Sequence, residues 1–289
     1  MANIKDLKKK IKSTKSTLKI TTAMKLVSAA KLNKAQHAIL SARPYAQELE
    51  KTIRTVSALV KDYSHKYLEE NKDNKRAVLL VVSSNKGLCG SYNSQVIKKV
   101  AKFLKETDLD CKVYFIGKKA RDILKSEVNE GKLYQFTKIE PSFVEMSDIA
   151  SELGALFESG EVGRVMMAYN VFHSAISIEP TIKQLLPFSL SKEEKSELQE
   201  KFPFDFKYEP EPKEILDTLI PDVYVSAVWT AMLDAFAAEH GSRMSAMDNA
   251  TGNCKDAIRS LTLKMNKLRQ AAITTELIEV VSGAESLNA

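Results

Sequence analysis

The residues most suggestive of chemistry form the glycine-rich stretch SSNKGLCGSYN at positions 83–93. It follows the apolar run AVLLVV and precedes SQVIKKVAKFL, whose apolar residues have helical spacing. Many α/β proteins hold a phosphate at such a turn, because the helix N-terminus offers free N–H groups and the positive end of its dipole. The stretch therefore raises the question of whether this chain binds a nucleotide.

The stretch lacks the residues of the known phosphate motifs. A P-loop reads G-x-x-x-x-G-K-[ST], with a lysine for the outer phosphates and a hydroxyl for magnesium. Here Gly87 and Gly90 are three residues apart, and Ser91 and Tyr92 follow. The dinucleotide pattern G-x-G-x-x-G is also incomplete. We therefore interpret the stretch as a structural turn, with a phosphate site as the alternative.

No other set of residues has the spacing of a catalytic or metal site. The sequence contains no G-x-S-x-G, no H-E-x-x-H and no aspartate-rich metal loop. The isolated histidines, which we expect at the surface or in packing, are His37, His65 and His173. The cysteines, too few and too widely spaced for a disulfide framework or a zinc site, are Cys89, Cys111 and Cys254. We expect no catalytic residue, no cofactor and no metal.

The elements that must position these residues begin with a long N-terminal arm, residues 1–60. From Ile4 to Val60, steps of three and four residues meet apolar, small or hydroxyl side chains, and Lys25 is the only charge among them. A repeat of 3.5 residues keeps one face toward a partner helix, which is typical of a coiled coil. Pro44 interrupts the repeat and is expected to kink the helix.

A second arm, residues 213–289, has the same repeat from Leu233 to Ala272. His240 lies on its stripe and is expected to be partly buried, since no second His or Cys has metal spacing. At 1.5 Å per residue the two arms are about 85 Å and about 110 Å long. We predict an antiparallel coiled coil in which residue 4 lies near residue 269, so that the rest of the second arm overhangs as a single helix.

Between the arms the hydrophobic period changes. The runs RAVLLVV, CKVYFIG and GRVMMAYNVF alternate with helical stretches near 94–106, 118–128 and 143–158, as in a mainly parallel sheet covered by helices. Residues 175–188 add an antiparallel edge strand, whose prolines suit an edge. The predicted fold class is therefore α/β with long helices, with a Rossmann-like α/β domain (75–190) inserted into the coiled coil. Residues 191–212 are interpreted as a loop.

The formal net charge of +6 is unevenly distributed, because residues 1–35 hold ten lysines against Asp6 alone. Such an arm could bind nucleic acid, an anionic lipid surface or an acidic protein. It contains no aromatic residue and no arginine, which disfavours nucleic acid. No apolar run approaches the ~20 residues of a membrane span. A nucleotide-handling enzyme, a basic nucleic-acid-binding rod and a mechanical shaft joining two partners remain as alternatives.

Three stretches carry a resemblance to the γ subunits of F-type ATP synthases. NKLRQAAITTELIEVVSGAESL (266–287) resembles their terminal signature. IKDLKKKIKSTKSTLKITTAMKLVSAAKL resembles their N-terminal segment, with Ser28 where the family has alanine. SSNKGLCGSYN resembles their S-D-R-G-L-C-G-x-x-N turn, with Asn85 and Lys86 replacing Asp and Arg. The three stretches occur in the family's order and extend over practically the whole chain.

The resemblance implies a non-catalytic central rotor that couples ion flow through the membrane c ring to ATP synthesis or hydrolysis. Its arms would turn inside a ring of α and β subunits, which hold the nucleotides, while the α/β domain rests on the c ring and the ε subunit. Acidic β-subunit loops would face the basic arm through exchangeable ion pairs, each worth ~0 to 1 kcal/mol. No nucleic acid is expected. The family-like start at residue 2 implies a bacterial-type subunit, peripheral on the cytoplasmic face of the inner membrane and only indirectly in contact with it.

The resemblance also assigns contact residues. Met24 and Lys25 match the place where the shaft meets the catalytic subunits. The polar cluster that loops of those subunits would grip through directional hydrogen bonds is Arg269, Gln270, Thr274 and Glu276. The residues that resemble the segment seated on the c ring and ε are Tyr208, Glu209 and Glu211. Without the resemblance, the Arg269 cluster would be interpreted as a solvated helix surface.

Overall fold

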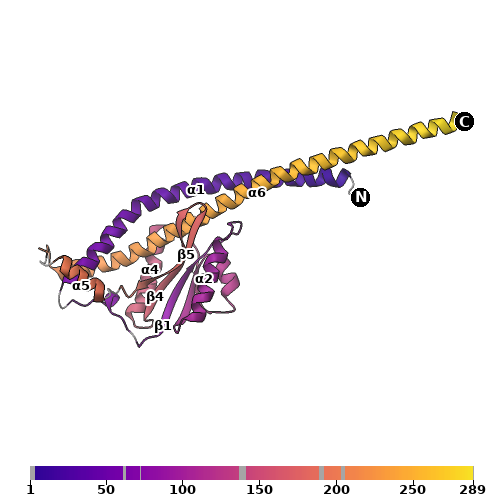
Figure 1. Ribbon diagram of the computed structural model, residues 1–289. Helices are drawn as coiled ribbons and strands as arrows, with labels where there is room; N and C mark the ends of the chain where they lie inside the picture. Colours follow the sequence, from indigo (N-terminus) through magenta and orange to yellow (C-terminus); the bar gives the residue numbers. More distant parts are fainter. Residues whose placement is uncertain are drawn as a thin grey trace. The chain divides into compact units, whose positions relative to one another are not determined.

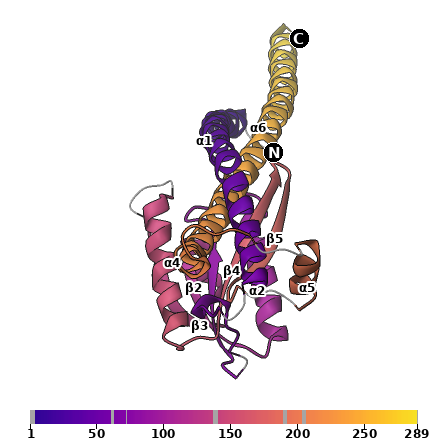
Figure 2. The ribbon, with the colours of Figure 1, turned by 90° about the vertical axis from the view of Figure 1, so that its left-hand side faces the viewer.

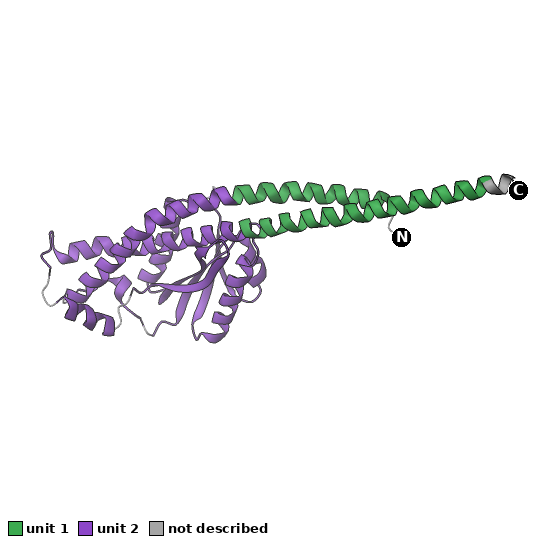
Figure 3. Cartoon of the chain, turned by 45° about the horizontal axis from the view of Figure 1, so that its top comes forward, with its two compact units in different colours: residues 1–28, 244–289 green, residues 29–243 purple. Residues whose placement is uncertain are grey.

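The computed structural model describes residues 4–60, 63–71, 73–136, 141–188, 192–202 and 206–288. The chain divides into two compact units, shown in Figure 3. Unit 1 comprises residues 1–28 and 244–289, and unit 2 comprises residues 29–243. Both long helices, α1 (Ile4–Leu59) and α6 (Pro212–Asn288), contribute to both units.

Unit 2 contains a five-stranded sheet in the order β3-β2-β1-β4-β5. The strands are β1 (Arg76–Val82), β2 (Asp110–Ile116), β3 (Asn129–Tyr134), β4 (Arg164–Ser174) and β5 (Ser177–Leu186). β1 pairs in parallel with β2 and β4, β2 pairs in parallel with β3, and β5 pairs with β4 in the antiparallel direction. The antiparallel edge strand expected over 175–188 is therefore confirmed, and Pro180 lies in it.

Successive residues of β1 face two different hydrophobic clusters, because side chains alternate across a strand. Val78 and Leu80 belong to one cluster, with residues of α4 (Phe143–Glu158), α1 and α6. Leu79 and Val81 belong to the other, with residues of α2 (Tyr92–Glu106) and α3 (Lys118–Leu124). α4 and α2 thus lie on opposite sides of the sheet, as Figure 2 shows.

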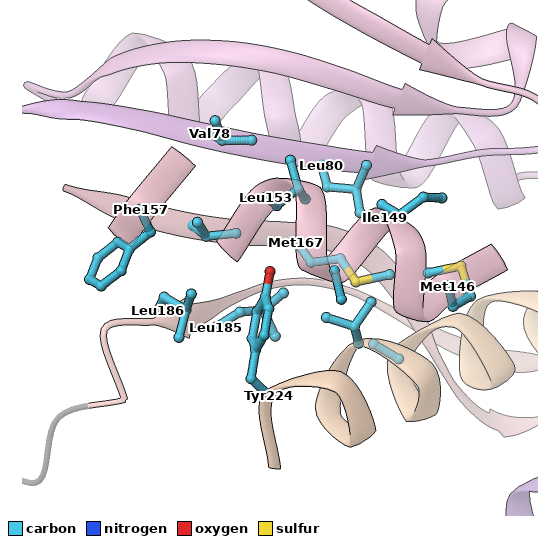
Figure 4. Packing of buried hydrophobic residues seen from close by; sticks show 14 of the residues in the cluster. Val78, Leu80, Met146, Ile149, Leu153, Phe157, Met167, Leu185, Leu186 and Tyr224 are labelled. Carbon is cyan, nitrogen blue, oxygen red and sulfur yellow. The ribbon is translucent and has the colours of Figure 1, made fainter. Parts of the chain in front are cut away.

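The first cluster joins the sheet to the part of α6 that belongs to unit 2. Figure 4 shows Leu80 of β1, Leu153 of α4 and Tyr224 of α6 directed toward one another. Leu80 and Leu153 are fully buried. Complete burial of such a side chain contributes about 1.5–3 kcal/mol. This packing explains why a long stretch of α6 is apolar on several sides rather than on one stripe.

Three features differ from the sequence-based expectation. β3 was missed, because its burial alternates only weakly and it lies at the edge of the sheet. α3 ends at Leu124, earlier than the expected residue 128. The segment 191–212, interpreted as a loop, contains the helix α5 (Lys192–Lys201). α5 has almost no apolar residues, so it has no hydrophobic period that could be recognised; Gln199 Nε2 instead donates to the carbonyl of Ala58 at 2.8 Å.

α1 and α6 run side by side in both units. α1 is a single helix with Pro44 inside it, and its ribbon in Figure 1 is unbroken. In unit 2, Arg43 Nη2 lies 2.9 Å from Asp234 Oδ1, which is nearly buried. Burial raises the pKa of Asp234, an effect that Arg43 partly opposes. In unit 1, Thr251 Oγ1 donates to Thr21 Oγ1 at 2.9 Å, and Lys25 Nζ lies 2.6 Å from Asp248 Oδ1. The predicted antiparallel pairing and fold class are confirmed.

Candidate functional site

The glycine-rich stretch forms a tight turn from β1 into α2. Leu88 and Gly90 have φ values of 63° and 58°, in the left-handed region that glycine adopts freely and leucine only at a cost. The Ser84 N–H donates to Asn93 Oδ1 at 3.0 Å, and Ser84 Oγ donates to the carbonyl of Lys86 at 2.6 Å. These bonds connect the two ends of the turn, so its polar groups maintain the conformation of the turn itself.

Arg243 of α6 bonds to the same turn from outside it. Its Nη2 donates to the carbonyl oxygens of Lys86 at 3.1 Å and Gly87 at 3.4 Å. Its Nη1 lies 2.8 Å from Glu239 Oε1, and the two side chains are only 9% and 20% exposed. Burial raises the pKa of Glu239, and the charge of Arg243 partly opposes this. The guanidinium therefore has a carboxylate on one side and two carbonyls on the other.

The surroundings of the turn bear on whether this chain binds a nucleotide there. The turn lies at the carboxyl end of β1 beside β4, where open α/β sheets with this strand order bind their ligands. Asn170 of β4 donates to the carbonyl of Tyr92 at 3.1 Å, and Tyr92 is 1% exposed. Burial raises the pKa of Tyr92 well above its usual value. Side chains of the protein thus donate hydrogen bonds to backbone carbonyls at this end of β1 and β4.

The histidines have structural surroundings. His65 accepts a hydrogen bond from the Tyr67 N–H at 3.1 Å, and burial lowers its pKa. His173 lies 3.1 Å from Glu179 across the β4–β5 hairpin, and His37 is exposed. His240, expected to be partly buried, is buried, with its ring edge-to-face against Phe236 at 4.5 Å between centroids. In the described ranges, no group of three or more His, Cys, Asp or Glu residues could hold a metal ion.

The three cysteines are buried or half-buried. Cys89 and Cys111 are buried, and Cys254 is half-buried in unit 1. Burial raises the pKa of the Cys111 thiol to about 11, which keeps it protonated and unreactive at neutral pH.

The residues expected to contact catalytic subunits lie at two levels of unit 1. The first level is Met24 and Lys25, and the second level is Arg269, Gln270, Thr274 and Glu276. Met24 is half-buried, and Lys25 is engaged by Asp248. Arg269 and Gln270 are exposed. Since Arg269 is 21 residues beyond Asp248 on one helix, the two levels are about 30 Å apart. The structure does not bring these candidates together into one site.

Within the second level the candidates are neighbours. Gln270 and Thr274 are four residues apart on α6, and Thr274 Oγ1 donates to the Gln270 carbonyl at 3.0 Å. Arg269 and Glu276, seven residues apart, lie on the same side of the helix two turns from each other. All four side chains are exposed.

The helix pair of unit 1 ends where the sequence predicted. Thr21 lies opposite Thr251 and Lys25 opposite Asp248, so the numbers of opposed residues add to 272 or 273, which places Ile4 opposite residues 268–269. Every described side chain of α6 after Ala272, up to residue 284, is exposed. Figure 3 shows α6 continuing past the N-terminus as a single helix.

This overhang is rich in large apolar side chains. Ile273, Leu277, Ile278, Val280 and Val281 are 49%, 60%, 61%, 69% and 55% exposed. Five such side chains within nine residues form an exposed apolar patch, and patches of this kind mark interaction sites. We refer to residues 273–284 as the overhang.

The candidates for the c ring and ε lie just before α6. Tyr208 is half-buried, packs against the first hydrophobic cluster and meets Phe206 edge-to-face. Glu209 and Glu211 are exposed. By length and hydropathy α6 could cross a membrane, but 56% of the relevant window is buried inside the protein, as in the core helix of a soluble domain.

Sequence reasoning missed Arg243 and Glu239. The available signal was the pair of charges, four residues apart, in the otherwise buried stretch AFAAEHGSRM. Charged side chains are rarely buried unless they are paired. That rule identifies the ion pair but not the turn on which Arg243 acts, because the turn lies more than 150 residues away along the chain.

The fold and the candidate sites define a class: an antiparallel two-helix protein with an inserted α/β unit, whose glycine-rich turn is held by hydrogen bonds from its own side chains. The sequence profile of the family described as ATP synthase matches residues 3–287. The ATP synthase gamma chain of Christiangramia forsetii is 40% identical over 291 residues, covering 100% of both chains. That of Anaeromyxobacter sp. is 41% identical over 295 residues, covering 99% of this chain and 100% of the relative.

Solved structures agree in fold. A chain in the Euglena gracilis mitochondrial ATP synthase (OSCP/F1/c-ring) has a TM-score of 0.69 at 21% identity, covering 98% of this chain and 94% of that chain. A chain in the Tetrahymena thermophila mitochondrial ATP synthase (central stalk and c-ring) has a TM-score of 0.57 at 24% identity, covering 80% and 99%. This chain belongs to the ATP synthase gamma chain family.

Proposed function

We propose that this chain is the central rotor of an F-type ATP synthase, coupling ion flow through a c ring to ATP synthesis or hydrolysis in α and β subunits. Membership of the gamma chain family supports this role. The observation that carries it is the overhang, a single helix whose five large apolar side chains are each about half exposed or more. A ring of α and β subunits that encloses the overhang as an apolar sleeve would bury it without fixing its rotation, because hydrophobic contact is non-directional.

The candidate contact residues at the two levels of unit 1 supply directional contacts in this proposal. Arg269 and Gln270 are the donors that loops of the catalytic subunits would bind and release, and Thr274 and Glu276 extend the same surface. Met24 and Lys25 form the first level. Asp248 already holds the Lys25 ammonium at 2.6 Å, so a partner carboxylate would compete with an exposed ion pair that contributes ~0 to 1 kcal/mol. Weak, exchangeable pairing suits a surface that must turn.

In unit 2, we assign Tyr208, Glu209 and Glu211 to contact with the c ring and the ε subunit. Tyr208 packs against the first hydrophobic cluster of unit 2, and the neighbouring Glu209 and Glu211 are exposed and available for such contact. The chain would then be peripheral to the membrane, on the cytoplasmic face of a bacterial inner membrane, with the c ring between it and the lipid.

The proposed rotor has no chemistry of its own, and we expect the isolated chain not to bind Mg-ATP at micromolar concentration. The reason is that the turn lacks the lysine and hydroxyl of a P-loop, and its carbonyls already accept hydrogen bonds from Arg243. Calorimetric titration of the purified chain with Mg-ATP measures this. Saturable one-to-one heat, abolished by a substitution at Gly87 or Gly90, would contradict the structural role of the turn and restore the enzyme alternative.

Native purification tests the proposed function as a whole. A tagged chain is expected to bring down two abundant partners that bind ATP, and the complex is expected to hydrolyse ATP. Recovery of RNA or DNA instead, with binding that falls steeply as salt rises, would favour the basic nucleic-acid-binding rod. Treatment with nuclease before purification separates a true nucleic-acid partner from passive carry-over on the lysine-rich arm.

A further inference from the structure

Three helices of unit 2 border a groove with a volume of about 540 Å³. Its lining includes, from α1, α4 and α6 in turn, Tyr45, Phe143, Asp222 and Trp229. Sites for small molecules typically enclose roughly 300–1,000 Å³ and combine a mostly apolar lining with a few polar groups. The groove therefore has the size and the composition of a small-molecule site, and none of its lining residues belongs to the contacts assigned above.

Aromatic side chains stand around this groove. Phe143 and Trp229 meet edge-to-face, with 5.7 Å between their ring centroids and 86° between their ring planes. Trp229 also packs against the first hydrophobic cluster, which restrains its ring. Phe143 and Tyr45 are 51% and 62% exposed, so a ligand could contact both rings. The face of an aromatic ring carries partial negative charge and attracts a cation that lies within about 6 Å of its centre.

The polar groups of the groove also favour a cation. Asp222 lies two helical turns before Trp229 on the same side of α6, and its side chain is exposed. Among the described residues that line the groove, it is the only charged one. Ser41 Oγ donates its proton to the carbonyl of His37 at 3.0 Å, so its oxygen has only lone pairs to offer a ligand. An anion would thus find no opposite charge in this lining.

We propose that this groove binds an amphipathic organic cation, a tertiary or quaternary ammonium attached to an apolar body. The ammonium would lie between the Asp222 carboxylate and the aromatic faces, and the apolar body would lie against Ala38, Ala42 and Val225. A metal ion does not fit this lining, because Ca²⁺ and Mg²⁺ need several oxygen ligands and one carboxylate supplies too few. The inference goes beyond the rotor role and does not depend on it, since all the lining residues belong to unit 2 of one chain.

Trp229 is the single tryptophan of the chain, so its fluorescence reports on the groove directly. Titration of the full-length chain with benzyltrimethylammonium is expected to change the Trp229 emission in a saturable manner. Phenylacetate carries the same aryl group with the opposite charge, and benzyl alcohol carries it without charge. We expect phenylacetate to give no saturable change over the same concentration range, and benzyl alcohol to bind more weakly than the cation.

Two variants separate the contributions of charge and aromatic surface. Asp222→Asn keeps the size of the side chain and removes its charge, so it is expected to weaken binding of benzyltrimethylammonium about fivefold and to leave binding of benzyl alcohol unchanged. Phe143→Leu keeps an apolar side chain and removes one aromatic face, and is expected to weaken binding of the cation about threefold. As a matched control, Asp256→Asn removes an exposed carboxylate of α6 in unit 1 and should bind the cation like the parent.

Three results would overturn the proposal. A chain that gives no saturable response to benzyltrimethylammonium has no such site. Equal responses to the cation, phenylacetate and benzyl alcohol would rule out recognition of charge and would indicate an apolar surface for a partner protein instead. Unchanged affinity for the cation in both Asp222→Asn and Phe143→Leu would place the binding elsewhere. If Phe143→Leu does not fold, Asp222→Asn decides alone. Because each measurement uses the isolated chain, a failure of the rotor assignment in native purification would leave these results unaffected.

Discussion

Removing residues 277–289 is expected to leave the thermal melting of the isolated chain nearly unchanged and to weaken its assembly with α and β subunits about a hundredfold or more. The helix pair ends near Ala272, and the described side chains of the removed part, up to residue 284, are exposed. Loss of exposed surface residues usually changes the free energy of unfolding by less than about 0.5 kcal/mol.

The expected loss of assembly follows from burial. Leu277, Ile278, Val280 and Val281 are each more than half exposed. Full burial of one such side chain contributes about 1.5–3 kcal/mol, so partial burial of four would contribute on the order of 3 kcal/mol. That corresponds to about a hundredfold in the dissociation constant.

Circular dichroism of the isolated chain and quantitative reconstitution measure the two effects. Leu277→Gln with Ile278→Gln is a matched variant of full length, which separates loss of apolar contact from loss of helix length. It should also weaken assembly, though less than the truncation. A large fall in the melting temperature of the truncated chain would show that the tail packs within the subunit. It would contradict the proposal that α and β subunits enclose the overhang.

Arg269→Ala combined with Gln270→Ala is the second change with a large expected effect. Both side chains are exposed on α6, and no contact that stabilises the fold depends on them in the described structure. The isolated double variant should therefore melt like the parent. In the reconstituted complex we expect impaired assembly or ATP turnover reduced at least about tenfold, because each hydrogen bond to a charged partner contributes about 1.5–3 kcal/mol.

A control pair on the same helix sharpens this experiment. Arg259 and Ser260 are also exposed neighbours, one basic and one hydroxyl-bearing, and lie two to three turns earlier. Their double alanine variant should change turnover less than the Arg269 and Gln270 variant if contact is concentrated at the second level. Equal effects would indicate a diffuse electrostatic surface, and normal turnover in the Arg269 and Gln270 variant would remove both residues from the proposed contacts.

The sequence by itself determined the helix pair. A stripe that repeats every 3.5 residues keeps one face of a helix turned toward a partner helix. The two stripes, Ile4 to Val60 and Leu233 to Ala272, therefore predicted the pairing of the two helices and the residue at which it stops. The same local logic found β1, β2 and β4, because runs of buried strand are continuous and apolar. It also predicted the overhang, since the register followed from counting residues along two helices of unequal length.

Only the tertiary structure decided how the glycine-rich turn is held. Arg243 belongs to no local pattern. It donates to the carbonyls of Lys86 and Gly87 because α6 passes the turn that follows β1. β3 and α5 escaped sequence analysis for a related reason: an edge strand and a highly polar helix are stabilised by pairing and by isolated contacts, not by a repeating apolar face. Periodicity records which side of an element is buried, whereas the partner of a single polar group is set by where the folded chain brings distant segments together.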